Sequence, residues 1–233
     1  MNSNENPMKC KSSAFEGVIV GKRNRTAVMA AKRVVAGPVD DSLNPLVLVG
    51  PSGSGKTRIL TAIATGITSM EDGRMVISTT GQKFLEDYIY ALENGSVSCF
   101  RDKFKMADVL IIDGVEIFES SSHLANEFLP ILDDLMSNGR QIVASLSKPF
   151  KALKSVDERV LGRLESGAVL SLGYPDEDMK YRYIKSYLSM KDVALADSTV
   201  KRIVKSPARS FWEVKGTLCV ALCKKQLTND HGE

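Results

Sequence analysis

Short apolar runs alternate with longer stretches of helical periodicity along most of the chain. Apolar runs bounded by glycine, proline or polar residues are typical of buried strands, and we expect such strands at 46–49, 75–78, 107–113, 141–146 and 168–172. Apolar residues spaced i, i+3 and i+4 predict helices at 24–36, after Gly55, and at 82–93, 97–104 and 124–136. Strands that alternate with helices indicate a parallel sheet covered on both faces.

The strand signals stop after Leu172. Three further helices are expected at 176–189, 197–205 and 211–225, each preceded by a capping or breaking residue. The first residues are polar and lack periodicity. We therefore expect a flexible leader at 1–14, an α/β core at 15–172 and a small helical lid at 173–228.

Composition narrows the class of protein. The hydrophobic fraction of 43% and the charged fraction of 25% are ordinary for a globular protein with a sizeable core. A net charge of +3 is too balanced to indicate a dedicated nucleic-acid binder. No apolar run is long enough for a membrane span, and the start lacks the apolar core of a signal peptide. We expect a cytoplasmic protein that makes no use of a membrane.

The cysteines give little support to a metal site. None forms a CxxC pair, and both histidines, His123 and His231, are distant in sequence. Two cysteines four residues apart in an apolar helical pattern are expected on one buried face, because free cysteine behaves as a small hydrophobe. The four cysteines are Cys10, Cys99, Cys219 and Cys223.

A phosphate-binding loop follows the first expected strand. Its residues are Gly50, Pro51, Ser52, Gly53, Ser54, Gly55, Lys56 and Thr57, which fit the GxxxxGK[ST] pattern in full. The glycines let the backbone N–H groups face a phosphate chain, and the positive end of the following helix adds attraction. Lys56 would reach the terminal phosphates and the Thr57 hydroxyl would hold Mg²⁺.

A second metal ligand is expected at the end of a neighbouring strand. Asp113 closes the hydrophobic run 109–112 and would hold the magnesium ion with Thr57. The alternative is an ordinary carboxylate at a strand end. Together the two motifs predict that the chain binds ATP or ADP with Mg²⁺.

Several segments, in the same order along the chain, resemble the nucleotide-binding module of the DnaA family. Residues 15–24 resemble the entry motif that contacts adenine, and 44–46 precede the loop as in that family. Residues 83–113 resemble its initiator helices and following strand, 156–163 its VEDRLxSR segment, and 174–176 its proline turn. The resemblance runs from about Phe15 to Leu227.

The resemblance implies a P-loop AAA+ core with a five-stranded parallel sheet, a C-terminal three-helix lid, and a nucleotide between core and lid. Val20 and Asn24 would then contact the nucleotide. Arg163, with Arg159 nearby, would be an arginine finger offered to the nucleotide of a neighbouring subunit. The alternative is that both are solvated helix arginines.

Three positions depart from the family pattern in its catalytic chemistry. Gly114 stands where an acid should orient the attacking water, and Glu116 lies two residues further on. Trp212 stands where the lid should present an arginine, with Arg209 the nearest substitute. The expected sensor aspartate after the fourth strand is replaced by Ser145 or Ser147. These departures together favour a chain that binds nucleotide and hydrolyses it weakly.

A fourth departure concerns single-stranded DNA. The stretches that contact it in DnaA are here 119–123 and 89–91, from which basic character is mostly gone. Contact with DNA phosphates is therefore expected to be weak or absent. Arg101, Lys103 and Lys105 fit a solvated helix face better than a DNA contact.

The domain layout resembles that of Hda-like regulators of replication initiation, which act on DnaA. This implies a partner that is DnaA or a like AAA+ subunit, with oligomers that depend on nucleotide. The leader lacks the clamp-binding peptide of those regulators. Three alternatives stay open: a non-catalytic adaptor that binds DnaA, a helicase-loader or transposase-helper ATPase, and a decaying copy or fragment of an initiator.

Overall fold

The computed structural model describes residues 14–70 and 72–230, without the side chains of Ser122 and of 228–230. The expected leader, apart from Ala14, lies outside the described residues, as do Cys10 and His231. None of the helices in the described ranges is long and apolar enough to cross a membrane.

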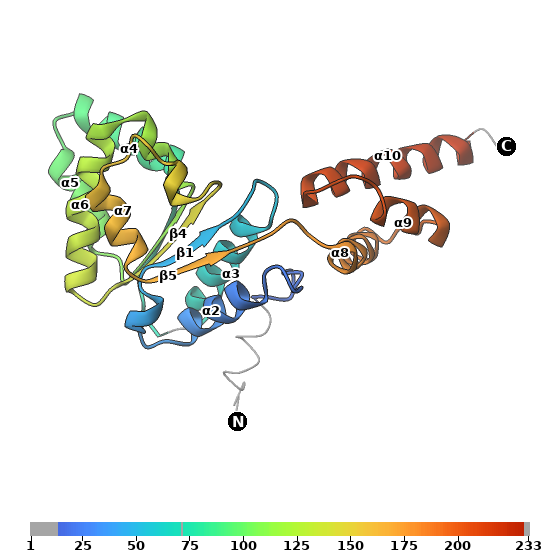
Figure 1. The fold of residues 1–233 in the computed structure, drawn as a ribbon, viewed down its shortest axis with the longest axis horizontal. Helices are drawn as coiled ribbons and strands as arrows, with labels where there is room; N and C mark the ends of the chain where they lie inside the picture. The colour runs from blue at the N-terminus through green and yellow to red at the C-terminus, as the bar shows by residue number, and fades with distance from the viewer. Residues whose placement is uncertain (1–13, 71, 231–233) are drawn as a thin grey trace, which may run out of the picture.

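A five-stranded parallel sheet forms the centre of the core, as expected (Figure 1). Its order is β2-β3-β4-β1-β5, and every adjacent pair is parallel. The strands are β1 (Leu46–Val49), β2 (Val76–Thr80), β3 (Val109–Asp113), β4 (Gln141–Leu146) and β5 (Ala168–Ser171). The predicted α/β fold class is therefore confirmed. Because all strands run the same way, their carboxyl ends share one edge, where ligands of open α/β sheets bind.

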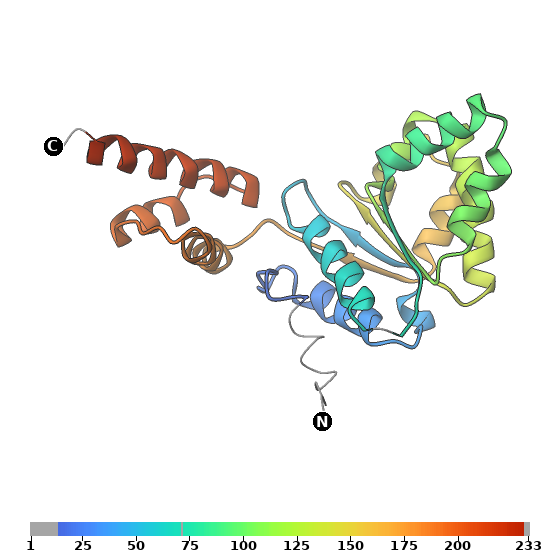
Figure 2. The ribbon, with the colours of Figure 1, turned by 180° about the vertical axis from the view of Figure 1, so that it is seen from behind.

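Helices cover both faces of the sheet (Figures 1 and 2). One face is covered by α2 (Arg25–Ala36) and α3 (Lys56–Thr68). The other is covered by α4 (Gly81–Glu93), α5 (Val97–Lys105), α6 (Ser122–Ser137) and α7 (Glu158–Glu165). The strands serve both layers because successive side chains alternate between faces. In β3, for example, Leu110 joins the cluster under α6 while Ile111 joins the cluster under α3.

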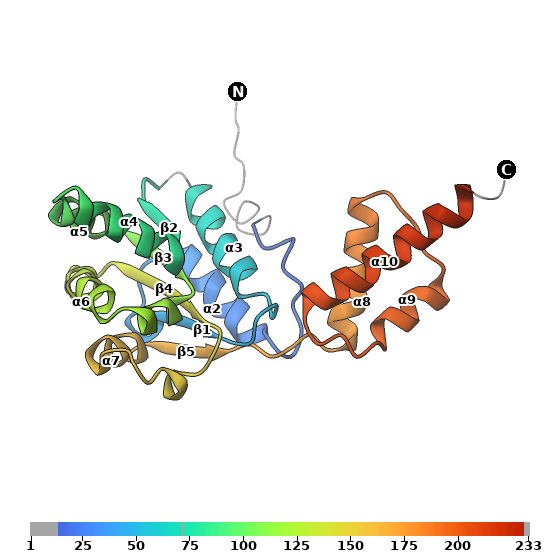
Figure 3. The ribbon, with the colours of Figure 1, turned by 90° about the horizontal axis from the view of Figure 1, so that it is seen from above.

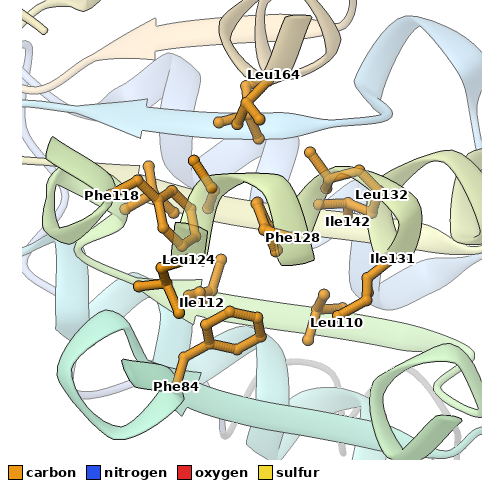
Figure 4. Packing of buried hydrophobic residues seen from close by; sticks show 14 of the residues in the cluster. Phe84, Leu110, Ile112, Phe118, Leu124, Phe128, Ile131, Leu132, Ile142 and Leu164 are labelled. Carbon is orange, nitrogen blue, oxygen red and sulfur yellow. The ribbon is translucent and has the colours of Figure 1, made fainter. Parts of the chain in front are cut away.

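An aromatic cluster fills the layer between the sheet and α4–α6 (Figure 4). Phe84 of α4 is fully buried and meets four other rings at centroid distances of 4.8 to 5.9 Å. These rings belong to Phe100, Phe104, Phe118 and Phe128. Edge-on and tilted aromatic pairs of this kind stabilise a core beyond simple area burial.

Three helices follow the sheet: α8 (Glu177–Met190), α9 (Asp197–Val204) and α10 (Phe211–Asp230). They bury a cluster of their own, which includes Ile184, Leu188, Val200, Ile203, Val214 and Leu218. They stand to one side of the sheet in Figure 3, joined to it by the segment after β5. Residues 211–230 continue as helix beyond the expected end.

The expectation that Cys219 and Cys223 share a buried face was wrong. Cys219 is half-buried, with its Sγ 3.9 Å from the hydroxyl of Tyr187, whereas Cys223 is exposed. The buried stripe of α10 runs instead through Val214 and Leu218. Cys223 lies off that stripe because it is five residues from Leu218.

Some local elements were not expected from the pattern. Helix α7 and three short 3₁₀ turns lie outside the elements that the pattern predicted. The turns are η1 (Asp41–Leu43), η2 (Val115–Ser120) and η3 (Phe150–Ala152). The expected strand 107–113 begins only at Val109, and the Asp108 carboxylate just before it accepts a hydrogen bond from the N–H of Met75 at 2.7 Å.

Candidate functional site

The glycine-rich loop connects the carboxyl end of β1 to α3, as the motif requires. Gly53 and Gly55 have φ of +74° and +101°, a region that favours glycine. The N–H of Gly50 donates to the Leu146 carbonyl of β4 at 3.0 Å, which ties the loop to the sheet edge. The loop therefore presents the N-terminus of a helix of 13 residues, with its positive dipole end, at the ligand-binding edge.

Lys56 lies folded into the loop. Its side chain is 9% exposed, and its ammonium donates to the carbonyls of Gly50 at 2.6 Å and Pro51 at 3.2 Å. Burial lowers the pKa of Lys56, and the charges of Glu116 and Asp113 oppose that effect. Among the described residues the buried hydroxyl of Ser54 has no hydrogen-bond partner. A buried ammonium without a carboxylate contact and an unsatisfied hydroxyl both fit a phosphate group.

The two expected magnesium ligands meet directly. The Thr57 hydroxyl donates to Asp113 Oδ2 at 2.6 Å, and the buried Ser145 hydroxyl of β4 donates to Asp113 Oδ1. A hydroxyl and a carboxylate are the oxygen donors that Mg²⁺ prefers, so these residues fit the ion. Within the described ranges no group of three His, Cys, Asp or Glu side chains could hold a metal unaided. Further ligands would come from phosphate and water.

Gly114 turns the chain immediately after β3. Its φ of +88° is left-handed, and its N–H donates to Ser145 Oγ at 3.0 Å. Glu116 follows in η2, and its Oε2 accepts a hydrogen bond from the N–H of Ser147 at 3.2 Å. Of the two serines considered at the sensor position, Ser145 thus contacts Asp113 by its side chain and Ser147 contacts Glu116 by its backbone.

The N-terminus of α10 rests on the phosphate-binding loop. The N–H of Phe211 donates to the Gly53 carbonyl at 3.0 Å. A Cβ built on Gly53 would lie 2.6 Å from both Ser210 Cβ and Trp212 Cδ1. Trp212 therefore touches the loop by one edge while 67% of it stays exposed. No sequence motif signals this backbone contact, so sequence reasoning missed it.

The two entry-segment residues lie beside the core on the α3 side of the sheet. Asn24 is buried, and its amide is used within its own loop: Oδ1 accepts from the Gly21 N–H at 2.8 Å and Nδ2 donates to the Ile19 carbonyl at 2.9 Å. Val20 is half-buried and packs against the hydrophobic cluster between the sheet and helices α2 and α3. Asn24 therefore fixes the shape of this segment.

The two candidate arginine fingers lie on the outer surface of α7. Arg163 Nε donates to Asp133 of α6 at 2.6 Å, with the arginine side chain 53% exposed. Arg159 pairs with Asp157, the residue that caps the same helix, at 2.7 Å. Hydrogen bonding and charge from Asp157 raise the pKa of Arg159. The structure does not bring either arginine to the phosphate-binding loop of its own chain.

The small basic group on α5 is engaged in ion pairs. Arg101 pairs with Glu127, Lys103 with Asp87 and Lys105 with Asp134. On α4 the residues Ile89 and Tyr90 are exposed and uncharged.

This fold and this site define a P-loop protein of the AAA+ class. A strand, a glycine-rich loop and a helix hold a buried lysine beside a hydroxyl–carboxylate pair, and a three-helix unit touches the loop. The chain belongs to the family of bacterial DnaA ATPase domains, whose profile matches residues 10–171, more than half of its length.

Individual relatives agree with this assignment. The replication initiator DnaA of Campylobacter jejuni is 31% identical over 208 residues, which cover 89% of this chain and 47% of that protein. The chain thus spans about half the length of the curated relatives it matches. Domain III of DnaA from Thermotoga maritima superposes with a TM-score of 0.86 at 26% identity, covering 94% of this chain and 91% of that one. A DnaA bound to AMPPCP and single-stranded DNA shares the fold, with a TM-score of 0.80 at 24% identity over 88% of this chain and 63% of the other.

Proposed function

We propose that this chain is an Hda-like AAA+ regulator in the control of chromosomal replication initiation. It binds ATP or ADP with Mg²⁺ at its own loop, hydrolyses it weakly, and acts in the cytoplasm on DnaA or a like subunit. The core at 15–172 and the lid at 173–228 hold the nucleotide between them. The observation that supports the proposal most is the position of Arg163, which is exposed on α7 and pairs with Asp133 rather than with any residue of the phosphate-binding loop.

The loop geometry supports the proposed nucleotide binding. The N-terminus of α3 and the buried Lys56 would hold the phosphates. Val20 and Asn24, which belong to the entry segment, would lie beside the adenine base. Bound Mg²⁺ would neutralise phosphate charge, with Thr57 and Asp113 as its protein ligands. Phe211 and Trp212 touch the same loop, so the bound nucleotide would also set the angle between core and lid.

Topology favours action of Arg163 on another subunit. It lies near the end of α7, which leads into the amino end of β5. The phosphate-binding loop lies at the carboxyl end of the neighbouring strand β1. Helix α7 also covers the face of the sheet opposite α3. An arginine so placed would stabilise charge on a nucleotide held by a second molecule, and such a contact is worth about 10³–10⁵ in rate in known cases.

The test is hydrolysis of ATP preloaded on the DnaA of the same organism, measured with and without this chain. Stimulation is expected, and Arg163→Ala should abolish it while nucleotide binding by the variant stays unchanged. Arg182→Ala is the matched control, because Arg182 is also an exposed arginine in a surface ion pair but lies on α8. Equal stimulation by Arg163→Ala and the parent would refute the arginine-finger role.

Single-stranded DNA is expected to bind weakly or not at all. Arg101, Lys103 and Lys105 are already paired, so each phosphate contact would first have to break an ion pair.

The alternative of a DnaA-binding adaptor without catalysis predicts stable complex formation and no stimulation. The alternative of an independent ATPase of the helicase-loader or transposase-helper kind requires Glu116 and Arg209 to replace the lost catalytic groups, and it predicts turnover by the chain alone.

A further inference from the structure

The entry segment, residues 15–24, is attached to α3 by an arginine of that helix. Arg58 lies in the first turn of α3, and its Nε donates to the Gly17 carbonyl at 3.2 Å. Phe15 and Val18, on either side of this glycine, are buried in the hydrophobic cluster between the sheet and helices α2 and α3. Arg58 therefore joins the helix that begins at the phosphate-binding loop to the segment that resembles an adenine-binding motif.

The lack of a side chain at position 17 lets the guanidinium of Arg58 lie directly against the backbone. The three atoms nearest to a Cβ built on Gly17 all belong to Arg58: Nη2, which would overlap with it, Cζ at 2.8 Å and Nε at 3.0 Å. The φ of Gly17 is outside the left-handed region, so its backbone would accept alanine. An added methyl group would thus act by displacing the guanidinium.

The remainder of the entry segment is held by contacts of its own. Asn24 bonds to the N–H of Gly21 and the carbonyl of Ile19, and the N–H of Gly173 donates to the Arg23 carbonyl at 3.2 Å. These bonds do not involve α3. Loss of the Arg58 contact would therefore change the position of the segment relative to α3 rather than the shape of residues 19–24.

We propose that Arg58 is a positioning residue for the base of the nucleotide, because it sets the entry segment at a fixed distance from the helix that holds the phosphates. The inference rests on the proposed function, in which the entry segment lies beside the adenine base. Phosphate groups bind to the loop whether or not the entry segment is in place, whereas a nucleotide uses both at once. A ligand held at two places binds more tightly when their separation is fixed in advance, because less freedom is lost on binding.

The test is calorimetric titration of the full chain with ADP and, separately, with tripolyphosphate, which has phosphate groups and no base, both with Mg²⁺. Arg58→Ala should weaken ADP binding about three- to tenfold, as expected for the loss of one hydrogen bond, and should leave tripolyphosphate binding within about twofold. Arg33→Ala is the matched control, because Arg33 is also an exposed arginine on this face of the sheet but pairs with Asp40. Its affinity for both ligands should stay within about twofold of the parent.

Gly17→Ala separates the contact from the charge of Arg58. It keeps the arginine and displaces its guanidinium, so it should weaken ADP binding as much as Arg58→Ala does. The double variant should bind ADP no more weakly than Arg58→Ala alone, because both substitutions remove the same contact.

The outcomes distinguish failure of this inference from failure of the proposed function. Unchanged ADP affinity in Arg58→Ala or in Gly17→Ala overturns the inference, and so do additive losses in the double variant. An equal loss of tripolyphosphate affinity in Arg58→Ala also overturns it, because the arginine would then act on the phosphates or on the fold. In each of these cases the binding of ADP by the parent stands. A parent chain that binds no ADP refutes the proposed function, and this inference with it.

Discussion

The contact between the phosphate-binding loop and α10 can be tested with a single methyl group. Gly53→Ala places a Cβ 2.6 Å from Ser210 Cβ and Trp212 Cδ1, closer than side chains approach one another. Ser210 Cβ is fixed to the backbone, so the start of α10 must move to admit the new atom. The substitution therefore loosens the junction where the nucleotide is proposed to lie.

Gly53→Ala is expected to lower the free energy of unfolding in two ways, and their contributions can be measured separately. Its φ of +74° strains any residue with a Cβ by about 1–2 kcal/mol. Overpacking at a close contact costs a further ~1–3 kcal/mol. Gly73→Ala isolates the first effect, because Gly73 has a φ of +77° and nothing lies within 4 Å of its added Cβ. The difference between the two variants measures the contact itself.

The assay is urea unfolding of both variants, followed by circular dichroism and by fluorescence of Trp212, the only tryptophan. Gly53→Ala should lose about 1–3 kcal/mol more than Gly73→Ala in free energy of unfolding. Its native emission should also shift to longer wavelength, because Trp212 leaves the loop. Equal losses with unchanged emission would refute the contact between α10 and the loop.

Three further substitutions test other parts of the structure. Phe84→Ala removes a fully buried ring from four aromatic contacts and should lower the free energy of unfolding by about 3–5 kcal/mol in urea. A loss below 1 kcal/mol would contradict this packing. Asp133→Ala frees Arg163 from a surface ion pair worth ~0–1 kcal/mol, so stimulation of a partner's hydrolysis should rise by up to about fivefold and should not fall. Ser145→Ala leaves the N–H of Gly114 without its partner and should cost about 1–3 kcal/mol in unfolding, whereas an unchanged midpoint would show that another group satisfies this N–H.

The sheet and the phosphate-binding loop could be predicted from sequence because their signals are local. Buried parallel strands are continuous apolar runs, and β4 was predicted at its observed bounds, 141–146. The loop motif fixes its own backbone, since Gly53 and Gly55 take the conformations that only glycine adopts easily.

Features that depend on contacts between distant segments could not be predicted. Residues 218–223 of α10 are all apolar or cysteine, so the sequence has no helical periodicity there that would identify the buried face. For this reason Cys223 was expected on the buried face, although it is exposed. The asparagine of the entry segment matches a motif, but only the structure shows that Asn24 uses its amide on Gly21 and Ile19.

The central claim is that this chain binds nucleotide at Lys56 and its loop, and the most direct test is a calorimetric titration of ATP and ADP with Mg²⁺. We expect saturable binding of one nucleotide per chain by the parent, with Lys56→Ala weakened at least tenfold while it remains folded. Lys180→Ala is the matched control, because Lys180 is also a buried lysine that donates to a backbone carbonyl, at Ser206, but lies on α8. Absence of binding by the parent, or equal affinity in Lys56→Ala, would contradict the account.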